Sequence, residues 1–445
     1  MAFIHEGSCE CAKSELDLFS VPATQTSVES GTYVEYHPIS SMTGGAPIEF
    51  DVTASGDDYL DLANSLLCVR AKITRVNDED LDGADTVGPV NNFFHSLFSQ
   101  VDVSLNGTLI TSSTNTYAYR AYIETLLSYG IEAKSSQLTS ALFYKDDAGK
   151  MDHPNPLAVD GNAGLATRQS FGVESREIDM IGRIHADIFF QERYMLNEVN
   201  AKIKLVRSHD AFCLMATGAR HFKVVLTTAT LLVRKVKISP SVYLAHAKTL
   251  ESGTAKYPIK RVVCKTFTIP AGYLDVSNEK LFSGQLPVRL IVGLVDNRAY
   301  NGDRERNPFN FQHFSLTEIG IYLDGQLHGL KPLKLDYAAG RYAAAYAGLF
   351  GGTNKINRDE GNGISRFDFA NGYALYAYDL SPDLGENDHV NLTRQGTVRV
   401  DLKFGVALAH TVTVVAYAEF GSATSSSILS TDVHGRNQSI RSRVL

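Results

Sequence analysis

The sequence predicts an all-β protein made of two consecutive eight-stranded jelly rolls, a double jelly roll with short inserted helices. Three observations lead to this prediction. Residues 92–109 are matched without a gap by residues 310–327, which begin 218 positions later. Each half of the chain holds about eight segments of strand character, the number found in one jelly roll. The 445 residues also exceed the roughly 250 to 300 at which a single core stops growing, and a duplication explains the excess.

The repeated segment predicts the same β-hairpin in both halves. Its identical pairs are Asn92/Asn310, Phe93/Phe311, His95/His313, Leu105/Leu323, Gly107/Gly325 and Leu109/Leu327. In each copy, alternating apolar residues lead to an Asn-Gly or an Asp-Gly dipeptide. These dipeptides favour a type I′ turn, because both of its central residues need a positive φ.

The first half is expected to consist of an N-terminal arm, residues 1–32, and a first jelly roll, residues 33–238. The arm shows no sustained apolar periodicity. Beside the hairpin, strands are predicted at 48–52, 58–76, 178–190, 199–206 and 221–238. A helix is predicted at 115–129, where apolar residues recur at three-and-four spacing and Gly130 is placed to end it. Residues 131–175 are long, punctuated by Gly and Pro and weakly patterned.

A connector helix is predicted within residues 239–256. Ser239 offers an N-cap, Pro240 suits the first helical position, and Gly253 offers a stop. The second jelly roll, residues 257–421, replays the first, with strands at 259–269, 288–295, 373–380, 397–404 and 411–420 and a helix at 341–350. In its strand at 397–404, the apolar residues Val398, Val400 and Leu402 correspond to Ala201, Ile203 and Leu205. Residues 422–445 are expected to form a flexible, mildly basic C-terminal tail.

The composition excludes several function classes. A net charge of −7 argues against a dedicated nucleic-acid or anionic-membrane binder, although a local basic patch stays open. The opening residues lack the basic and apolar regions of a secretory signal, and no apolar run reaches the ~20 residues of a membrane span. Three cysteines, Cys68, Cys213 and Cys264, stand in or beside apolar stretches and are expected to act as small hydrophobic residues.

No residue is nominated as catalytic, cofactor-binding or metal-binding, and no cofactor is expected. Cys9 and Cys11 lack the second pair that a zinc site needs. The acidic stretch from Asp78 to Gly83 starts like an EF-hand loop, but Pro89 occupies the position of the bidentate Glu, so a solvated loop is expected. His95 and His313 are expected to be separate turn residues with local hydrogen bonds. The glycines at 348–352 before Lys355 fail the spacing of a phosphate loop.

Several stretches of the chain resemble the major capsid (hexon-type) proteins of Polinton/Maverick elements and the related adintoviruses. These stretches are SCECAKSELDLF (8–19), YLDLANSLLCVRAKI (59–73), VGPVNNFFHSLFSQVDVSLNG (87–107), NTYAYRAYIETLLSYG (115–130), VGLVDN (292–297), NPFNF (307–311) and NGYALYAYDL (371–380). The likeness covers nearly the whole chain. The matching stretches are core-packing and turn sequences, and the resemblance depends on their joint occurrence in the same order. None of them identifies a catalytic or binding residue.

The resemblance implies a viral major capsid protein that forms a homotrimer and tiles an icosahedral shell around a double-stranded DNA genome. Three chains of two similar barrels present six similar lobes, and three charges of −7 give −21 for the trimer. Implied partners are neighbouring capsomers, penton and minor capsid proteins, and packaged DNA for the basic tail. The implied location is the virion capsid, after synthesis and assembly inside the host cell without a secretory signal. One departure is size, because many such proteins carry larger loops.

Structural roles follow as hypotheses. Residues 131–175 are the candidate for an outward loop, and the arm and tail are expected at the base of the capsomer. The helices that carry Tyr119, Tyr122, Tyr342 and Tyr346 could flank subunit contacts or plug a barrel edge within one subunit.

Two other function classes stay open. Paired jelly rolls also occur in a glycoprotein amidase and in copper monooxygenases, but the His residues are dispersed and only 6 Met are present. A glycan-binding protein is the third alternative, weakened by the absence of Trp.

Overall fold

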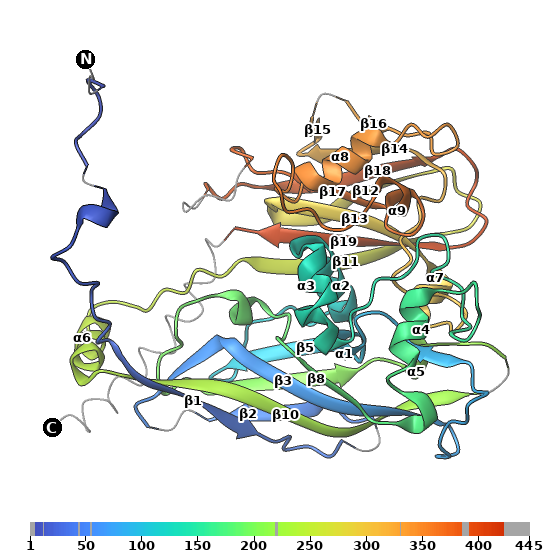
Figure 1. Cartoon of the computed structure of the whole chain (residues 1–445). Coiled ribbons are helices and arrows are strands. Elements are labelled where there is room, and N and C mark those ends of the chain that lie inside the picture. The colour runs from blue at the N-terminus through green and yellow to red at the C-terminus, as the bar shows by residue number, and fades with distance from the viewer. Residues whose placement is uncertain are drawn as a thin grey trace.

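A computed structural model describes residues 5–421, except residues 12, 43–44, 54–55, 219–220, 330 and 385–390. The tail predicted at 422–445 therefore lies outside the described residues. The described chain forms two barrels of antiparallel strands that lie one upon the other, with helices between them and at their ends (Figure 1).

The first barrel consists of two four-stranded sheets. One sheet has the order β1 (Val28–Tyr36), β10 (Phe222–Ile238), β3 (Tyr59–Arg75), β7 (Ile178–Gly182). The other has the order β2 (Ile48–Val52), β8 (Ala201–Arg207), β5 (Phe98–Leu105), β6 (Thr108–Leu109). A further short pair joins β4 (Val87–Pro89) to β9 (Leu214–Ala216).

The second barrel repeats this arrangement. Its first sheet has the order β11 (Arg261–Ile269), β19 (Val412–Phe420), β13 (Arg289–Asp296), β17 (Leu375–Asp379). Its second sheet has the order β12 (Asp275–Gln285), β18 (Gln395–Phe404), β14 (Leu316–Leu323), β15 (Gln326–Leu327), and β16 (Leu333–Lys334) pairs with β14. If the eight main strands of each barrel are counted along the chain, both barrels have the sheet orders 1-8-3-6 and 2-7-4-5. The predicted pair of eight-stranded jelly rolls is confirmed.

The repeated hairpin is present in both barrels, as predicted. The turn between β5 and β6 has φ of 48° at Asn106 and 86° at Gly107, and the turn between β14 and β15 has 51° at Asp324 and 80° at Gly325. The strand registers also correspond: Leu105 pairs with Ala201 and Leu323 with Val398, and the same match continues along β5 and β14. Positive φ at both central residues is the requirement of a type I′ turn.

Nine α-helices lie in the described part of the chain: α1 (Phe93–Ser96), α2 (Tyr117–Ser128), α3 (Ile131–Ser135), α4 (Ala163–Gln169), α5 (Asp210–Cys213), α6 (Pro240–Leu250), α7 (Asn297–Asn301), α8 (Ala343–Gly351) and α9 (Arg366–Ala370). The helices predicted at 115–129 and 341–350 correspond to α2 and α8. The helix predicted from Ser239 corresponds to α6. Pro240 opens that helix, but the Ser239 side chain makes no capping hydrogen bond.

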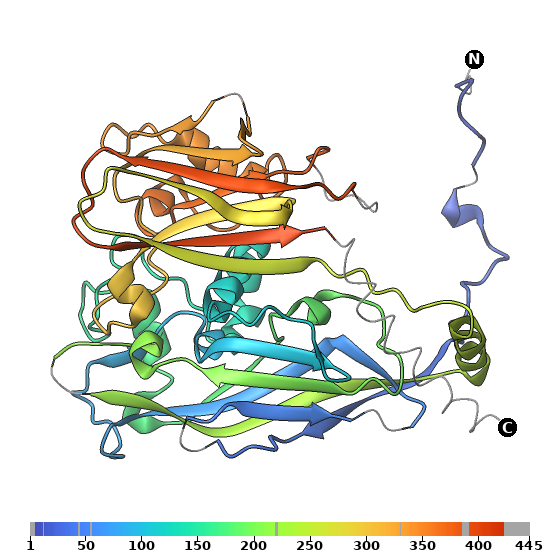
Figure 2. The same ribbon diagram turned by 180° about the vertical axis from the view of Figure 1, so that it is seen from behind.

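Two views from opposite sides show how the helices are distributed. Helices α2 and α3 lie between the barrels, and α6 lies at one end of them, beside the N-terminal arm (Figures 1 and 2). Helices α4, α5 and α7 lie toward the opposite end. The strands of both barrels run along the same general direction, from the α6 end to the α4 end.

Three details differ from the sequence predictions. Strand β1 starts at Val28, inside the range 1–32 assigned to the arm. Strand β12 was not predicted, because its mostly exposed and polar residues give no clean alternation of apolar and polar positions. The strand predicted at 178–190 ends at Gly182, and residues 187–190 form a turn of 3₁₀-helix.

The segment 131–175 is more buried than its weak pattern indicates. Its residues Phe143, Met151 and Leu165 belong to a hydrophobic core shared with the second barrel. Helix α3 lies between the barrels, whereas α4 lies near the end opposite α6 (Figure 1). Only part of this segment is therefore available as a surface loop.

Candidate functional site

Helix α2 connects the two barrels through its aromatic face. Although it follows the hairpin of the first barrel, its Tyr119 and Tyr122 belong to the core of the second. The Tyr122 ring stacks on Phe309 with a centroid distance of 4.1 Å and an interplanar angle of 6°. Stacked aromatic pairs add about 0.5–1.5 kcal/mol beyond their buried area. Helix α2 therefore contributes to the cores of both barrels, because its Tyr117 and Ala121 belong to the core of the first.

This burial bears on the two roles considered for the tyrosines. Tyr119 and Tyr122 are almost fully buried within a single chain, so their own side chains pack inside the subunit. This burial favours the alternative of a role within one subunit, whereas a subunit contact flanked by the helices stays a prediction. Tyr342 and Tyr346 pack against the core of the second barrel, but they are only partly buried.

A polar network crosses the same interface on the other side of α2. The Arg120 guanidinium donates to Glu124, with Nε 2.9 Å from Oε1, and to Asp187, with Nη2 2.6 Å from Oδ1. Glu124 also pairs with Nδ1 of His185. From the second barrel, the Tyr417 hydroxyl donates to Glu124 over 3.2 Å. One buried carboxylate thus joins α2, the segment after β7 and strand β19.

The network shifts the pKa values of its two carboxyl groups, Glu124 and Asp187. Burial by itself would raise the pKa of Glu124, but the charge of Arg120 and the contact with His185 lower this pKa to about 2. Burial raises the pKa of Asp187, and Arg120 offsets only part of this rise. An opposite charge within ~4–6 Å favours the ionised form of a carboxyl group, which explains the different behaviour of the better-partnered Glu124.

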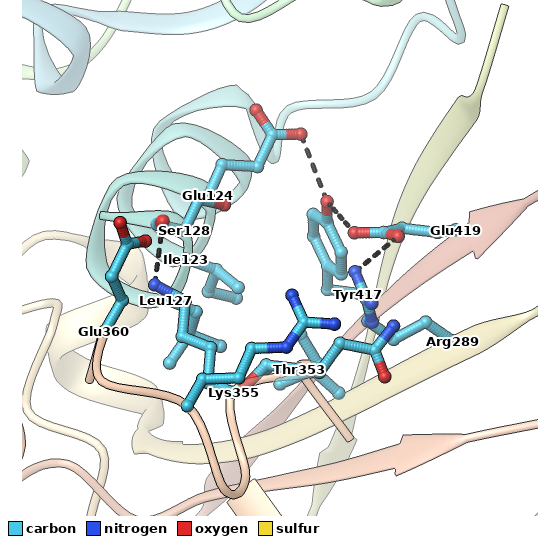
Figure 3. A pocket seen from close by; sticks show the side chains of 13 residues that line it. Ile123, Glu124, Leu127, Ser128, Arg289, Thr353, Lys355, Glu360, Tyr417 and Glu419 are labelled. Carbon is cyan, nitrogen blue, oxygen red and sulfur yellow. Dashed lines mark hydrogen bonds and ion pairs between the residues drawn. The ribbon is translucent and has the colours of Figure 1, made fainter. Parts of the chain in front are cut away.

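A polar pocket of about 200 Å³ lies beside this network, between α2, strands β13 and β19, and the loop after α8 (Figure 3). Its lining contains three cations and three carboxylates: Arg289, Lys355, Arg358, Glu124, Glu360 and Glu419. Arg289 pairs with Glu419 over 2.9 Å, and Lys355 donates to the carbonyl of Ser128 over 2.9 Å. The single hydroxyl proton of Tyr417 is shared between Glu124, at 3.2 Å, and Glu419, at 2.9 Å (Figure 3). The lining is balanced in charge, and its residues Arg289, Glu419, Tyr417 and Glu124 are bonded to one another, which suits a rigid junction between the barrels.

A second buried ion pair links the halves near α4. Arg168 and Asp146 are fully buried, with Nη2 2.7 Å from Oδ1. Asp146 also accepts hydrogen bonds from Asn162 over 2.8 Å and from Asn307 over 3.0 Å. The Tyr373 hydroxyl donates to its carbonyl over 2.6 Å. Because Asn307 and Tyr373 come from the second half, this satisfied charge pair also fixes one barrel against the other.

Three lysines bind three consecutive carbonyl groups of the loop before α9. Lys355 donates to Gly361, Lys134 to Asn362 and Lys145 to Gly363. Lys134 and Lys145 follow α2 in the first half, whereas the loop belongs to the second. Burial, with smaller contributions from the charges of Lys145 and Lys355, lowers the pKa of Lys134 to about 7.

The acidic stretch after β3 is a largely solvated loop, as expected, and Lys72, Lys223 and Arg75 form ion pairs with it. Arg75 forms ion pairs with Glu79, Asp82 and Asp85. In the described residues, no group of three His, Cys, Asp or Glu could hold a metal ion.

The duplicated histidines are used differently in the two barrels. His313 accepts a local hydrogen bond from the Ser315 amide over 2.9 Å, as predicted. For His95 the prediction of a local bond is wrong, because its Nδ1 lies 3.0 Å from the hydroxyl of Tyr117, in α2. Its buried ring also meets His185 edge-on at 4.5 Å.

The sequence analysis did not identify the residues that join the barrels. One local signal was available: Arg120 and Glu124 are four positions apart on an otherwise apolar helix, the spacing of a helical ion pair. A charged pair on an otherwise apolar helix indicates that the pair contacts a further polar group inside the protein. Asp187 and Tyr417 carry no comparable signal, because they approach α2 only through the tertiary fold.

The remaining expectations concern cysteines, glycines and membranes. Cys213 and Cys264 are buried and Cys68 is half-buried, whereas Cys9 and Cys11 are exposed. Gly348 and Gly351 lie inside α8, not in a phosphate-binding loop. The described part of the chain contains no helix with the length and apolarity needed to span a bilayer.

Comparison with known proteins identifies one curated relative and several solved structures. No protein-family profile matches the chain. The relative is an uncharacterized protein of Caenorhabditis elegans, 27% identical over 397 residues, which cover 86% of this chain and 92% of the relative.

The solved structures have much lower sequence identity. A chain of the Sputnik virophage has a TM-score of 0.63 at 12% identity and covers 94% of this chain and 91% of its own. The Faustovirus major capsid protein has a TM-score of 0.55 at 9% identity, with 91% of each chain covered. The mavirus major capsid protein has a TM-score of 0.52 at 11% identity, with 94% of this chain and 93% of its own covered. The chain therefore has the double jelly-roll fold seen in viral major capsid proteins.

Proposed function

We propose that the chain is a major capsid protein, and that three copies form a capsomer with six similar lobes that tiles an icosahedral shell around double-stranded DNA. The observation that carries the proposal is the pair of jelly rolls with identical strand order in one chain. Threefold symmetry acting on two similar barrels gives a nearly hexagonal outline, and closed symmetry of this kind is usual for homo-oligomers. The proposed role is structural, and no residue is assigned to catalysis.

The contacts between the barrels support this role. A tile of the shell needs lobes with a fixed relative position. The Asp146–Arg168 pair and the Arg120–Glu124–Tyr417 network are buried at the junction, where their groups are hydrogen-bonded. Buried charged groups that lose a partner are strongly destabilising, so such a junction resists displacement of one barrel against the other.

The finer assignment is a capsid protein of the Polinton/Maverick and adintovirus type. It is supported by the resemblance in sequence and by a relative that occurs in an animal, Caenorhabditis elegans. The proposed partners are neighbouring capsomers, penton and minor capsid proteins, and packaged DNA for the basic tail. The proposed location is the virion capsid, reached by assembly inside the host cell.

Light scattering of the purified protein tests the proposal. We expect a stable species of three times the chain mass of 48.7 kDa, about 146 kDa, or larger shells visible by electron microscopy. A monomer at all concentrations would contradict the proposal and favour an enzyme or a glycan-binding protein.

A further inference from the structure

An apolar groove of about 500 Å³ lies at the end of the first barrel that carries α6. Its walls are the start of β1, the end of β10, helix α6 and the segments 192–196 and 253–257. The main apolar residues are Val28, Leu196, Ile238, Val242, Leu250 and Tyr257. The volume is within the ~300–1,000 Å³ typical of pockets that bind ligands. An apolar hollow exposed to water is a favourable place for apolar side chains from a partner.

The N-terminal arm, which joins β1 at the wall of this groove, carries unburied apolar side chains. Leu16, Leu18, Phe19 and Val21 are all exposed, and the fraction reaches 97% for Phe19. Single exposed apolar residues are common on protein surfaces, but four within six positions form a patch that marks an interaction site. Figures 1 and 2 show that the arm leaves β1 beside α6 and extends away from both barrels. Its apolar side chains therefore remain outside the groove of their own chain.

We propose that residues 16–21 of the arm dock in the groove of a second copy of the chain. Both surfaces lie at the same end of the molecule, because the groove wall includes Ser27 and Val28, where the arm begins. Five residues lie between Val21 and Ser27, so an arm that points away from its own body can reach a neighbour at this end. Exchange of identical segments between copies is a known route to closed oligomers.

The charges of the two surfaces also fit. Within residues 16–21 the one charged side chain is the carboxylate of Asp17, and the preceding Glu15 is paired with Lys13. The groove is lined by two cations, Arg193 and Lys256, and one carboxylate, Glu192. A segment with a negative charge thus meets a groove with a net positive rim. This charge complementarity favours docking of the arm in the groove over non-specific apolar contact.

The inference rests on the proposed self-assembly, because it needs a second copy. It is tested by disulfide trapping between two different chains that each carry one introduced cysteine. One chain carries Ser20→Cys in the arm, and the other carries Thr249→Cys in the groove; both residues are exposed and polar, so the fold tolerates the changes. Both chains also carry Cys9→Ser and Cys11→Ser, because these exposed arm cysteines would cross-link by themselves. The chains bear tags of different mass.

After mixing, assembly and mild oxidation, we expect a disulfide-linked dimer that contains both tags. A matched control replaces Thr249→Cys by Val159→Cys, which is fully exposed before α4, and should give no such dimer. Addition of Leu18→Ser and Phe19→Ser to the arm chain should lower the yield about tenfold or more, because the apolar contact is lost.

Light scattering on the same samples separates the two proposals. Assembled protein without the mixed dimer would overturn the docking and leave the capsid proposal standing. A cross-link that forms only when both cysteines are in one chain, within that chain, would also overturn the docking. Protein that stays monomeric and uncross-linked would overturn both.

Discussion

The hydroxyl of Tyr417, in the last strand of the second barrel, donates a hydrogen bond over 3.2 Å to the Glu124 carboxylate of α2, which comes from the first half. The same carboxylate accepts from Arg120 and pairs with His185. Three partners from three segments therefore depend on one ionised group. The contact between the barrels is consequently sensitive to the charge of Glu124.

Replacement Glu124→Gln is expected to lower the free energy of unfolding by ~3 kcal/mol at pH 7, because the charge of Arg120 loses a buried partner. The folded-state pKa of about 2 lies below the ordinary value of 4.5. The stabilisation from ionised Glu124 is therefore fully present above pH 4.5 and is lost as the pH falls through about 2. Urea unfolding between pH 7 and pH 2 measures both effects.

The matched control for this variant is Glu132→Gln, at an exposed position in α3. It should change the stability by less than ~0.5 kcal/mol, as is usual for surface positions. If Glu124→Gln unfolded at the same urea concentration as the wild type and kept the same acid sensitivity, the role assigned to this carboxylate would be wrong.

Replacement Arg168→Met is expected to destabilise the chain by ~3–5 kcal/mol, because Asp146 would remain as a buried charge without its counter-ion. The double variant with Asp146→Asn should lose less than the sum of the two single variants, since the unpaired charge is then removed. Chemical denaturation of the three variants gives the coupling energy.

Arg70→Met provides the comparison with a surface pair. Arg70 lies 2.9 Å from Asp179, but both side chains are mostly exposed. Its replacement should change stability by at most ~1 kcal/mol. Equal losses in the free energy of unfolding for Arg70→Met and Arg168→Met would show that the buried ion pair contributes no more to stability than the surface pair.

Replacements Gly107→Ala and Gly325→Ala are each expected to destabilise by about 1 kcal/mol. A Cβ at either glycine would meet no atom within 4 Å, so the cost comes only from the positive φ of 86° and 80°. The two effects should add, because the turns belong to different barrels. Thermal unfolding measures each loss.

Gly348→Ala serves as the control of opposite sign. Gly348 lies within α8, and a Cβ there also meets nothing within 4 Å. Alanine is favoured over glycine in a helix, so this variant should gain ~0.5–1 kcal/mol. A loss at Gly348, or no loss at the two turn glycines, would contradict the conformational explanation.

The hairpins and their registers were predictable because their signals are local. Asn106-Gly107 and Asp324-Gly325 fix the turns, and the alternation of apolar residues fixes which face of each strand is buried. Strand β12 was missed because its exposed polar residues give no such alternation. Helix α2 was predicted as a helix, but its spacing could not indicate which barrel it would pack against.

The sequence by itself determined that a β-domain occurs twice, where its hairpins turn and which strands correspond, since these depend on short-range φ preferences and on the period of two along a strand. Only the tertiary structure decided how the two copies are joined. The pairs Glu124–Tyr417 and Asp146–Asn307 bring together residues more than 150 positions apart. Burial gives these contacts their strength, and burial is a property of the packed barrels that no local pattern contains.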